Sequence, residues 1–115
     1  MLKIEKSEKT YKVELFQVNK LNTLFSALVR DQLMELVQEK GAEVIFNLDG
    51  IRFIDSSGFG VLTEISDLAR NSGSQFRLCN ITEDVKELVN LLGLEGKFAL
   101  GTIESVEEKI LMVLD

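Results

Sequence analysis

Two hydroxyl side chains follow a carboxylate in residues 54–61, which read Ile-Asp-Ser-Ser-Gly-Phe-Gly-Val. An apolar run precedes this segment and an amphipathic helical pattern follows it, so Asp55, Ser56 and Ser57 are expected at a strand-to-helix junction. The start of a helix presents free backbone N–H groups and the positive end of the helix dipole, which together stabilise a negative charge. A serine at this junction is therefore a candidate for chemical modification.

The same residues argue against catalysis. The chain has no histidine that could activate a serine as a nucleophile, and Asp55 alone is not a catalytic site, so we expect no catalytic residue and no enzymatic activity. Gly58 and Gly60 superficially resemble a phosphate-binding loop, but both known spacings of such loops are absent. No cluster of histidine, cysteine and carboxylate residues predicts a metal site, and we expect no cofactor. The two glycines leave little side-chain bulk where a partner surface approaches.

Ser56 has two roles that the residues alone leave open. Serine at the start of a helix is a common N-cap, whose side chain accepts a hydrogen bond from a backbone N–H. Serine at the same place can also accept a covalent phosphate, which the helix N-terminus would tolerate. The two roles are compatible at one junction.

Composition limits the class of protein. With 115 residues, 45% of them hydrophobic, no proline and no low-complexity linker, the chain is expected to form one domain over residues 1–115. No apolar run is long enough to span a membrane, and residues 1–6 lack the apolar stretch of a signal peptide. Cys79 is the only cysteine, which fits a reducing, cytoplasmic location. The formal net charge of −6 argues against binding to nucleic acid or to an anionic membrane, and it favours either a basic protein partner or no more than solubility.

Strand and helix periodicities alternate along the chain. Strands are predicted at residues 2–6, 11–18, 43–48, 75–79 and 98–103. Helices are predicted at residues 26–40, from the motif to 71–73, from 83 to 92 with Thr82 as the cap, and from 102 or 105 onwards. This order predicts an α/β domain with a mixed, mostly parallel sheet, an opening N-terminal hairpin and about four helices.

The apolar positions of these elements define an expected core. Gly41 is expected as the C-cap glycine of the first helix, and Gly93 as the end of the third. Residues 53 and 54 are expected to be buried behind an accessible Ser56, and Cys79 to lie in the core. The expected core residues are Leu33, Leu36, Val44, Phe46, Ile65, Leu68, Leu88 and Ile110.

Residues 53–61 closely resemble the phosphorylation motif of STAS domains, in particular those of bacterial anti-sigma factor antagonists. The resemblance extends over essentially the whole chain and includes the Leu-Leu-Gly-Leu sequence at residues 91–94. It implies a STAS fold and a partner switch in transcription regulation. In that switch, the unphosphorylated antagonist binds an anti-sigma factor that is also a serine kinase, and thereby frees a sigma factor. Phosphorylation of the antagonist releases it, and a metal-dependent serine phosphatase restores it.

The resemblance assigns roles to individual residues. Ser56, the first serine after the aspartate, is implied as the phosphorylated residue. Phe59 and Val61 are expected on an exposed or half-exposed early turn of the helix. The residues implied to contact the partner are Asn22, Asp55, Ser57, Gly58 and Phe59.

Residues 19–22 depart from the family pattern. Antagonists of the best-known type carry Gly-x-Leu-Asp after the second strand, whereas this chain has Asn-Lys-Leu-Asn. Asn22 keeps the size and hydrogen-bonding capacity of aspartate but not its charge, so it cannot form a salt bridge to a kinase. Two other functions therefore stay open: a STAS adaptor that is not phosphorylated, and a small-ligand sensor in a transport or signalling assembly. The sequence does not determine whether the chain is a monomer or an oligomer.

Overall fold

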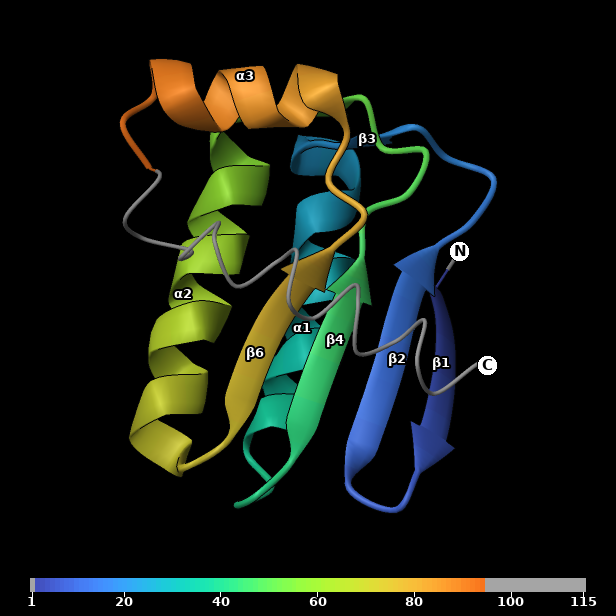
Figure 1. Ribbon diagram of the computed structural model, residues 1–115, viewed down its shortest axis with the longest axis vertical. Helices are drawn as coiled ribbons and strands as arrows, with labels where there is room; N and C mark the ends of the chain where they lie inside the picture. Colours follow the sequence, from blue (N-terminus) through green and yellow to red (C-terminus); the bar gives the residue numbers. More distant parts are fainter. Residues whose placement is uncertain (1, 95–115) are drawn as a thin grey trace.

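The protein is described by a computed structural model over residues 2–94. A four-stranded sheet has the order β1-β2-β4-β6, in which β1 and β2 form an antiparallel hairpin and the other neighbours are parallel. The helices α1 and α2 lie side by side against one face of this sheet (Figure 1). The elements are β1 (Leu2–Ser7), β2 (Thr10–Leu15), α1 (Thr23–Val37), β4 (Glu43–Asn47), α2 (Ser56–Ser72) and β6 (Gln75–Cys79). The expected mixed sheet with an opening hairpin is confirmed.

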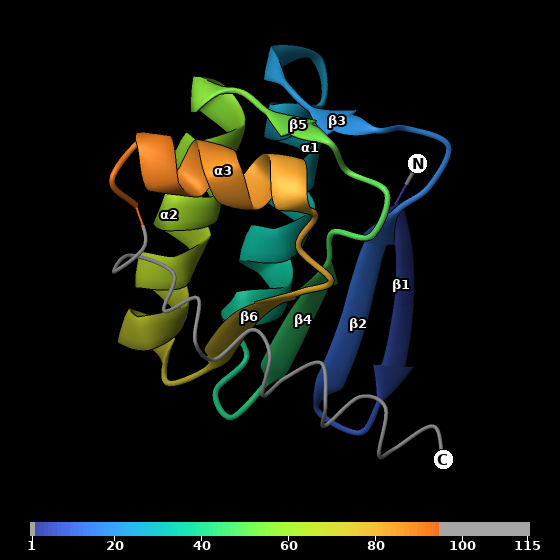
Figure 2. The same ribbon diagram turned by 45° about the horizontal axis from the view of Figure 1, so that its top comes forward.

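Three further elements gather at one end of the domain. Two short parallel strands, β3 (Lys20–Leu21) and β5 (Phe53–Ile54), pair with each other outside the main sheet. The third helix, α3 (Glu83–Leu91), lies at the same end (Figure 2). Residues 2–94 thus contain three helices, and the strand and fourth helix expected beyond residue 98 fall outside the described residues.

Alternate side chains on the helix-covered face of the sheet are buried and form one side of the core. In β2, Tyr11, Val13 and Leu15 are buried, while the residues between them are partly exposed, as the period of two in a strand requires. The strand register aligns these side chains with those of β4 and β6. Two rows cross the sheet, Tyr11–Val44–Phe76 and Val13–Phe46–Leu78.

The expected core is largely confirmed. Leu33, Val44, Phe46 and Ile65 are fully buried. The three other leucines of the expected core, at positions 36, 68 and 88, are partly buried and pack against it. Cys79 is buried as expected, although it belongs with Ile45 to a smaller separate cluster. Ile110 lies outside the described residues.

The first helix is displaced from its predicted bounds. It runs over Thr23–Val37 and not over residues 26–40, because the Asn22 side chain caps it by accepting a hydrogen bond from the Leu24 N–H at 3.1 Å. Gln38 is the C-cap, so the prediction for Gly41 is wrong. Gly41 instead has φ 83° in the turn before β4. Gly93 lies just after the end of the third helix as expected, and both Gly93 and Gly73, the C-cap of α2, have the left-handed conformation typical of helix C-termini.

Two strand predictions also require correction. The second strand ends at Leu15 and not at residue 18, because Gln17 has φ 64° and turns the chain away from the sheet. Phe53 is not buried with Ile54: the exposed fraction is 47% for Phe53 and 2% for Ile54. Adjacent residues of a strand point to opposite sides, and only the side of β5 that carries Ile54 packs against the core.

Candidate functional site

The pairing of β3 with β5 brings together the starts of α1 and α2. Leu21 is aligned with Ile54, and the Asp55 N–H donates a hydrogen bond to the Leu21 carbonyl at 3.1 Å. The residues that follow these strands are the N-caps, Asn22 for α1 and Asp55 for α2. Two helix N-termini therefore meet at one place, with the expected motif in the second of them.

Asp55 is the centre of this junction. Its Oδ1 accepts hydrogen bonds from the Ser57 hydroxyl at 2.7 Å and from the Gly58 N–H at 2.9 Å. Its Oδ2 accepts from the Thr23 N–H at 3.0 Å and from the Thr23 hydroxyl at 3.2 Å. One carboxylate thus satisfies backbone donors at the beginning of both helices.

These hydrogen bonds favour the ionised carboxylate. The Ser57 hydroxyl, the Gly58 N–H and the Thr23 donors lower the pKa of Asp55 below its ordinary value, and desolvation only partly opposes them. The positive ends of two helix dipoles act in the same direction. Asp55 is therefore a fixed negative charge beside Ser56.

Ser56 is exposed to solvent. It is the first residue of α2, and its side chain makes no hydrogen bond within residues 2–94. The interpretation of Ser56 as the N-cap is wrong, because Asp55 holds that position. Ser57 differs from its neighbour, since it is partly buried and its hydroxyl is bonded to Asp55.

Gly58 is explained by packing inside the domain. A Cβ at this position would lie 2.7 Å from the Ile54 Cγ2 and 2.8 Å from the Leu21 carbonyl oxygen. The junction therefore closes only around a glycine, whereas a Cβ on the exposed Gly60 would meet no atom within 4 Å. Gly58 is required by its own neighbours, and Gly60 is the glycine that faces outward.

Phe59 does not lie on an exposed turn. Its exposed fraction is 4%, and that of Val61 is 7%, so the expectation of an exposed position is wrong for both. Both side chains belong to the core, because the early turn of α2 packs inward on the side opposite Ser56 and Gly60. Phe59 thus packs inside the domain and is not available on its surface. Partner contacts of Asn22, Asp55 and Ser57, which are all partly exposed, stay predictions.

Thr23 was not identified from the sequence. It is exposed, binds Asp55 through its backbone and its side chain, and lies 3.3 Å from Ser57 through its hydroxyl. The pair Asn22-Thr23 before an apolar run is itself a helix-start signal, which predicts the first helix three residues earlier. Its proximity to the motif has no sequence signal.

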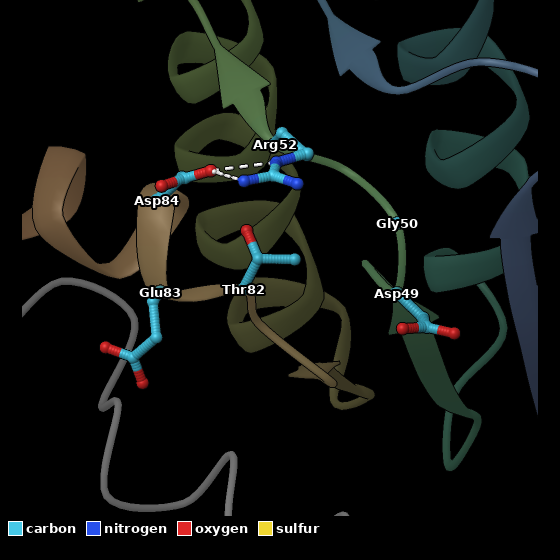
Figure 3. Close-up of a pocket in the computed structure, with 6 residues that line it drawn as sticks. All are labelled: Asp49, Gly50, Arg52, Thr82, Glu83 and Asp84. Carbon is cyan, nitrogen blue, oxygen red and sulfur yellow. Dashed lines mark hydrogen bonds and ion pairs between the residues drawn. The ribbon is translucent and has the colours of Figure 1, made fainter.

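A separate open cavity of about 360 Å³ lies beside α3 (Figure 3). Arg52 donates to Asp84 with two nitrogens, at 2.9 and 2.7 Å, and Thr82 donates to the Ile51 carbonyl at 2.7 Å. The lining residues are Asp49, Gly50, Arg52, Thr82, Glu83 and Asp84. None of them belongs to the motif. In the described part of the chain, no three histidine, cysteine or carboxylate side chains are placed to hold a metal ion.

No helix between residues 2 and 94 combines the length and apolar character needed to cross a membrane.

One curated relative, the anti-sigma F factor antagonist of Paenibacillus polymyxa, is 31% identical over 70 residues. This match spans 60% of the chain and 60% of the relative's own length.

Solved structures share the fold at low sequence identity. Phosphorylated SpoIIAA of Bacillus, a cell fate determinant, matches with a TM-score of 0.64 at 19% identity, covering 85% of this chain and 87% of that one. The murine Solute Carrier 26 family member A9 anion transporter matches with a TM-score of 0.67 at 19% identity, covering 86% of this chain and 16% of the transporter. The model of the STAS domain family matches residues 6–110. The chain therefore belongs to the STAS domain family and is similar to anti-sigma factor antagonists.

Proposed function

We propose that this chain is an anti-sigma factor antagonist that binds an anti-sigma factor with serine-kinase activity and is switched by phosphorylation of Ser56. The observation that carries the proposal is the position of Ser56, exposed at the first residue of α2 with a hydroxyl that no residue from 2 to 94 engages. Because Asp55 supplies the cap, the Ser56 hydroxyl is available for modification at no cost to the helix. The similarity to a curated antagonist supports the same function.

A phosphate on Ser56 would change the surface and leave the fold intact. It adds a charge of roughly −1.5 to −2 beside the ionised Asp55. The N–H groups and dipole at the start of α2 tolerate this charge, so the domain stays folded. A partner packed on the junction would have to desolvate a phosphate held beside the like charge of Asp55, which costs free energy at the interface. The switch thus acts through a lost interface.

Two exposed leucines extend this surface along α1. Leu24 directly follows Thr23, and Leu28 lies one turn further; their exposed fractions are 79% and 49%. Apolar side chains of this kind contribute to binding when a partner removes them from water. We infer that the anti-sigma factor contacts these leucines together with the junction, and that a phosphate on Ser56 interrupts this contact.

The experiment compares Ser56→Ala and Ser56→Asp with the wild type. Both variants are expected to unfold at nearly the wild-type denaturant concentration, since the hydroxyl supports no contact in the described domain. In a pull-down with the anti-sigma kinase from the same organism, Ser56→Ala should bind and resist phosphorylation, and Ser56→Asp should bind weakly. Ser57→Ala is the matched control and should still accept phosphate at residue 56.

Two results would contradict the proposal. The first is tight binding of Ser56→Asp. The second is a wild-type protein that the kinase and ATP label on Ser57 or on no residue. A constitutive adaptor is then the better interpretation, because the same fold forms part of an anion transporter and Asn22 stands where antagonists carry an aspartate. Intact-mass measurement of the protein from its native host separates the two functions, since only the switch requires a phosphorylated form.

A further inference from the structure

The two neighbouring serines at the start of α2 have hydroxyls in different surroundings. Ser57 Oγ donates to Asp55 Oδ1 at 2.7 Å and lies 3.3 Å from Thr23 Oγ1. Ser56 is exposed and makes no side-chain hydrogen bond in the described domain. Successive helical residues point roughly 100° apart, so only one of the two serines can face Asp55 and Thr23. The junction therefore distinguishes two hydroxyls that are chemically identical.

The hydroxyl groups of Ser57 and Thr23 and the carboxylate of Asp55 lie within hydrogen-bonding distance of one another. Two hydroxyl protons are available for the hydrogen bonds among these three groups. The 2.7 Å contact assigns the Ser57 proton to Asp55. The Thr23 hydroxyl lies 3.2 Å from Asp55 Oδ2 and 3.3 Å from Ser57 Oγ, so its proton is donated to one of these oxygens. The contacts among Asp55, Ser57 and Thr23 form a ring. When Thr23 donates to Ser57 Oγ, it holds that oxygen directly, and when it donates to Asp55, it orients the carboxylate that accepts the Ser57 proton. The bond from Ser57 to the ionised carboxylate is stronger than one to a neutral group.

This ring opposes phosphoryl transfer to Ser57. A serine that attacks a nucleoside triphosphate forms a bond from Oγ to the γ-phosphorus, while the bond to the β-phosphate oxygen breaks and the diphosphate leaves. The hydroxyl proton passes to a base on the kinase. Ser57 would first have to release Asp55, and its product would hold a phosphate against that carboxylate. Ser56 has no hydrogen bond to Asp55 to release, although its phosphate would also lie near that carboxylate.

We propose that Thr23 is a specificity-determining residue, which together with Asp55 holds the Ser57 hydroxyl out of reaction and directs phosphoryl transfer to Ser56. The inference rests on the proposed function, because it requires a kinase partner that supplies magnesium and ATP. It adds that the antagonist's own fold selects the serine. Thr23 reaches the motif only through the pairing of β3 with β5, 32 residues away along the chain.

The test removes Ser56 by Ser56→Ala and then removes the Thr23 hydroxyl by Thr23→Val. With kinase, magnesium and ATP, Ser56→Ala should be labelled on Ser57 slowly or not at all. Adding Thr23→Val, which keeps the β-branched shape and the backbone bond to Asp55, should raise the Ser57 labelling rate by roughly fivefold, the factor expected for one neutral hydrogen bond. Thr63→Val in the same background is the matched control on α2 and should not raise it. Thr23→Ser, which restores a hydroxyl, should return the rate to that of Ser56→Ala.

The outcomes distinguish a failure of the role proposed for Thr23 from a failure of the proposed function. If folded Ser56→Ala proteins with and without Thr23→Val are labelled equally on Ser57, the inference is wrong, while labelling of the wild type on Ser56 keeps the proposed function. If the wild type is labelled on neither serine, the proposed function fails, and the NMR side-chain couplings of Ser57 decide the inference. A single χ1 rotamer that becomes averaged in Thr23→Val supports the ring, and averaged couplings in the wild type overturn it.

Discussion

Asp55 Oδ2 lies 3.0 Å from the backbone nitrogen of Thr23, so the carboxylate that caps α2 also receives the first N–H of α1. Helix N-termini carry partial positive charge, and two of them converge on this one acid. The arrangement fixes the direction in which α2 leaves the junction. The start of α2, whose first residue is Ser56, is therefore held in place by the hydrogen bonds of Asp55.

The hydrogen bonds of Asp55 predict a specific pH dependence. The pKa of Asp55 is lower in the folded protein than its ordinary value of 3.8, because Ser57, Gly58 and Thr23 donate to the ionised form. The unfolded chain then binds more protons in this range, so the contribution of Asp55 to stability is present above pH 3.8 and is lost as the pH falls through the folded pKa. Asp55→Asn removes this contribution.

Denaturant unfolding of the wild type and of Asp55→Asn over a series of pH values measures the effect. The difference between their free energies of unfolding should be largest near neutrality and should shrink below pH 3.8. An NMR titration of the Asp55 carboxyl in the wild type reports the folded pKa directly. A difference that is constant from neutral to acidic pH would refute this account of the junction.

The two glycines of the motif should respond oppositely to alanine. Gly58→Ala places a Cβ 2.7 Å from Ile54 and 2.8 Å from the Leu21 carbonyl, and should cost about 1–3 kcal/mol of unfolding free energy. Gly60→Ala meets no atom within 4 Å and should gain up to about 1 kcal/mol from helix propensity. Chemical denaturation of both variants checks the pair. Equal effects would mean that the junction is packed differently.

Ser74 links the ends of α1 and α2. Its hydroxyl is buried, donates to the Val37 carbonyl at 2.7 Å and lies 3.3 Å from the Ala69 carbonyl oxygen. Ser74→Ala leaves the Val37 carbonyl without this donor in a buried place and should cost about 1–3 kcal/mol. Ser66→Ala, at a partly exposed site on α2, should change stability by no more than about 0.5 kcal/mol. A loss at residue 74 no larger than at residue 66 would show that the hydroxyl is dispensable.

Two leucines of α1 should separate folding from binding. Leu33 is fully buried, and Leu33→Ala should cost about 2–5 kcal/mol through lost contacts and a residual cavity. Leu24 is 79% exposed, and Leu24→Ala should change stability by less than about 0.5 kcal/mol. Leu24→Ala should instead weaken the pull-down with the anti-sigma kinase. Wild-type binding by Leu24→Ala would remove this leucine from the proposed interface.

Much of the fold follows from local patterns in the sequence. The alternation of apolar side chains in β2, the continuous apolar run of β4 and the helical spacing around Leu33 and Ile65 predict these elements and the side chains that they bury. These patterns are reliable because an amphipathic helix or edge-type strand buries one face and a central strand buries both, whatever lies opposite them. The motif at residues 54–61 likewise identifies a strand-to-helix junction, since its polar side chains interrupt an apolar run.

The sequence by itself determined the α/β class, the buried faces and the position of Ser56 at a helix start. Only the tertiary structure decided that Asp55 and not Ser56 is the cap, that Phe59 points inward, and that Thr23 reaches the motif. These features depend on contacts between residues that are far apart in the sequence, and local sequence patterns do not reveal such contacts. Strands of two residues, such as β3 and β5, are too short to leave a periodic signal, yet their pairing joins side chains 32 residues apart. The selectivity proposed for Ser56 depends on that long-range contact.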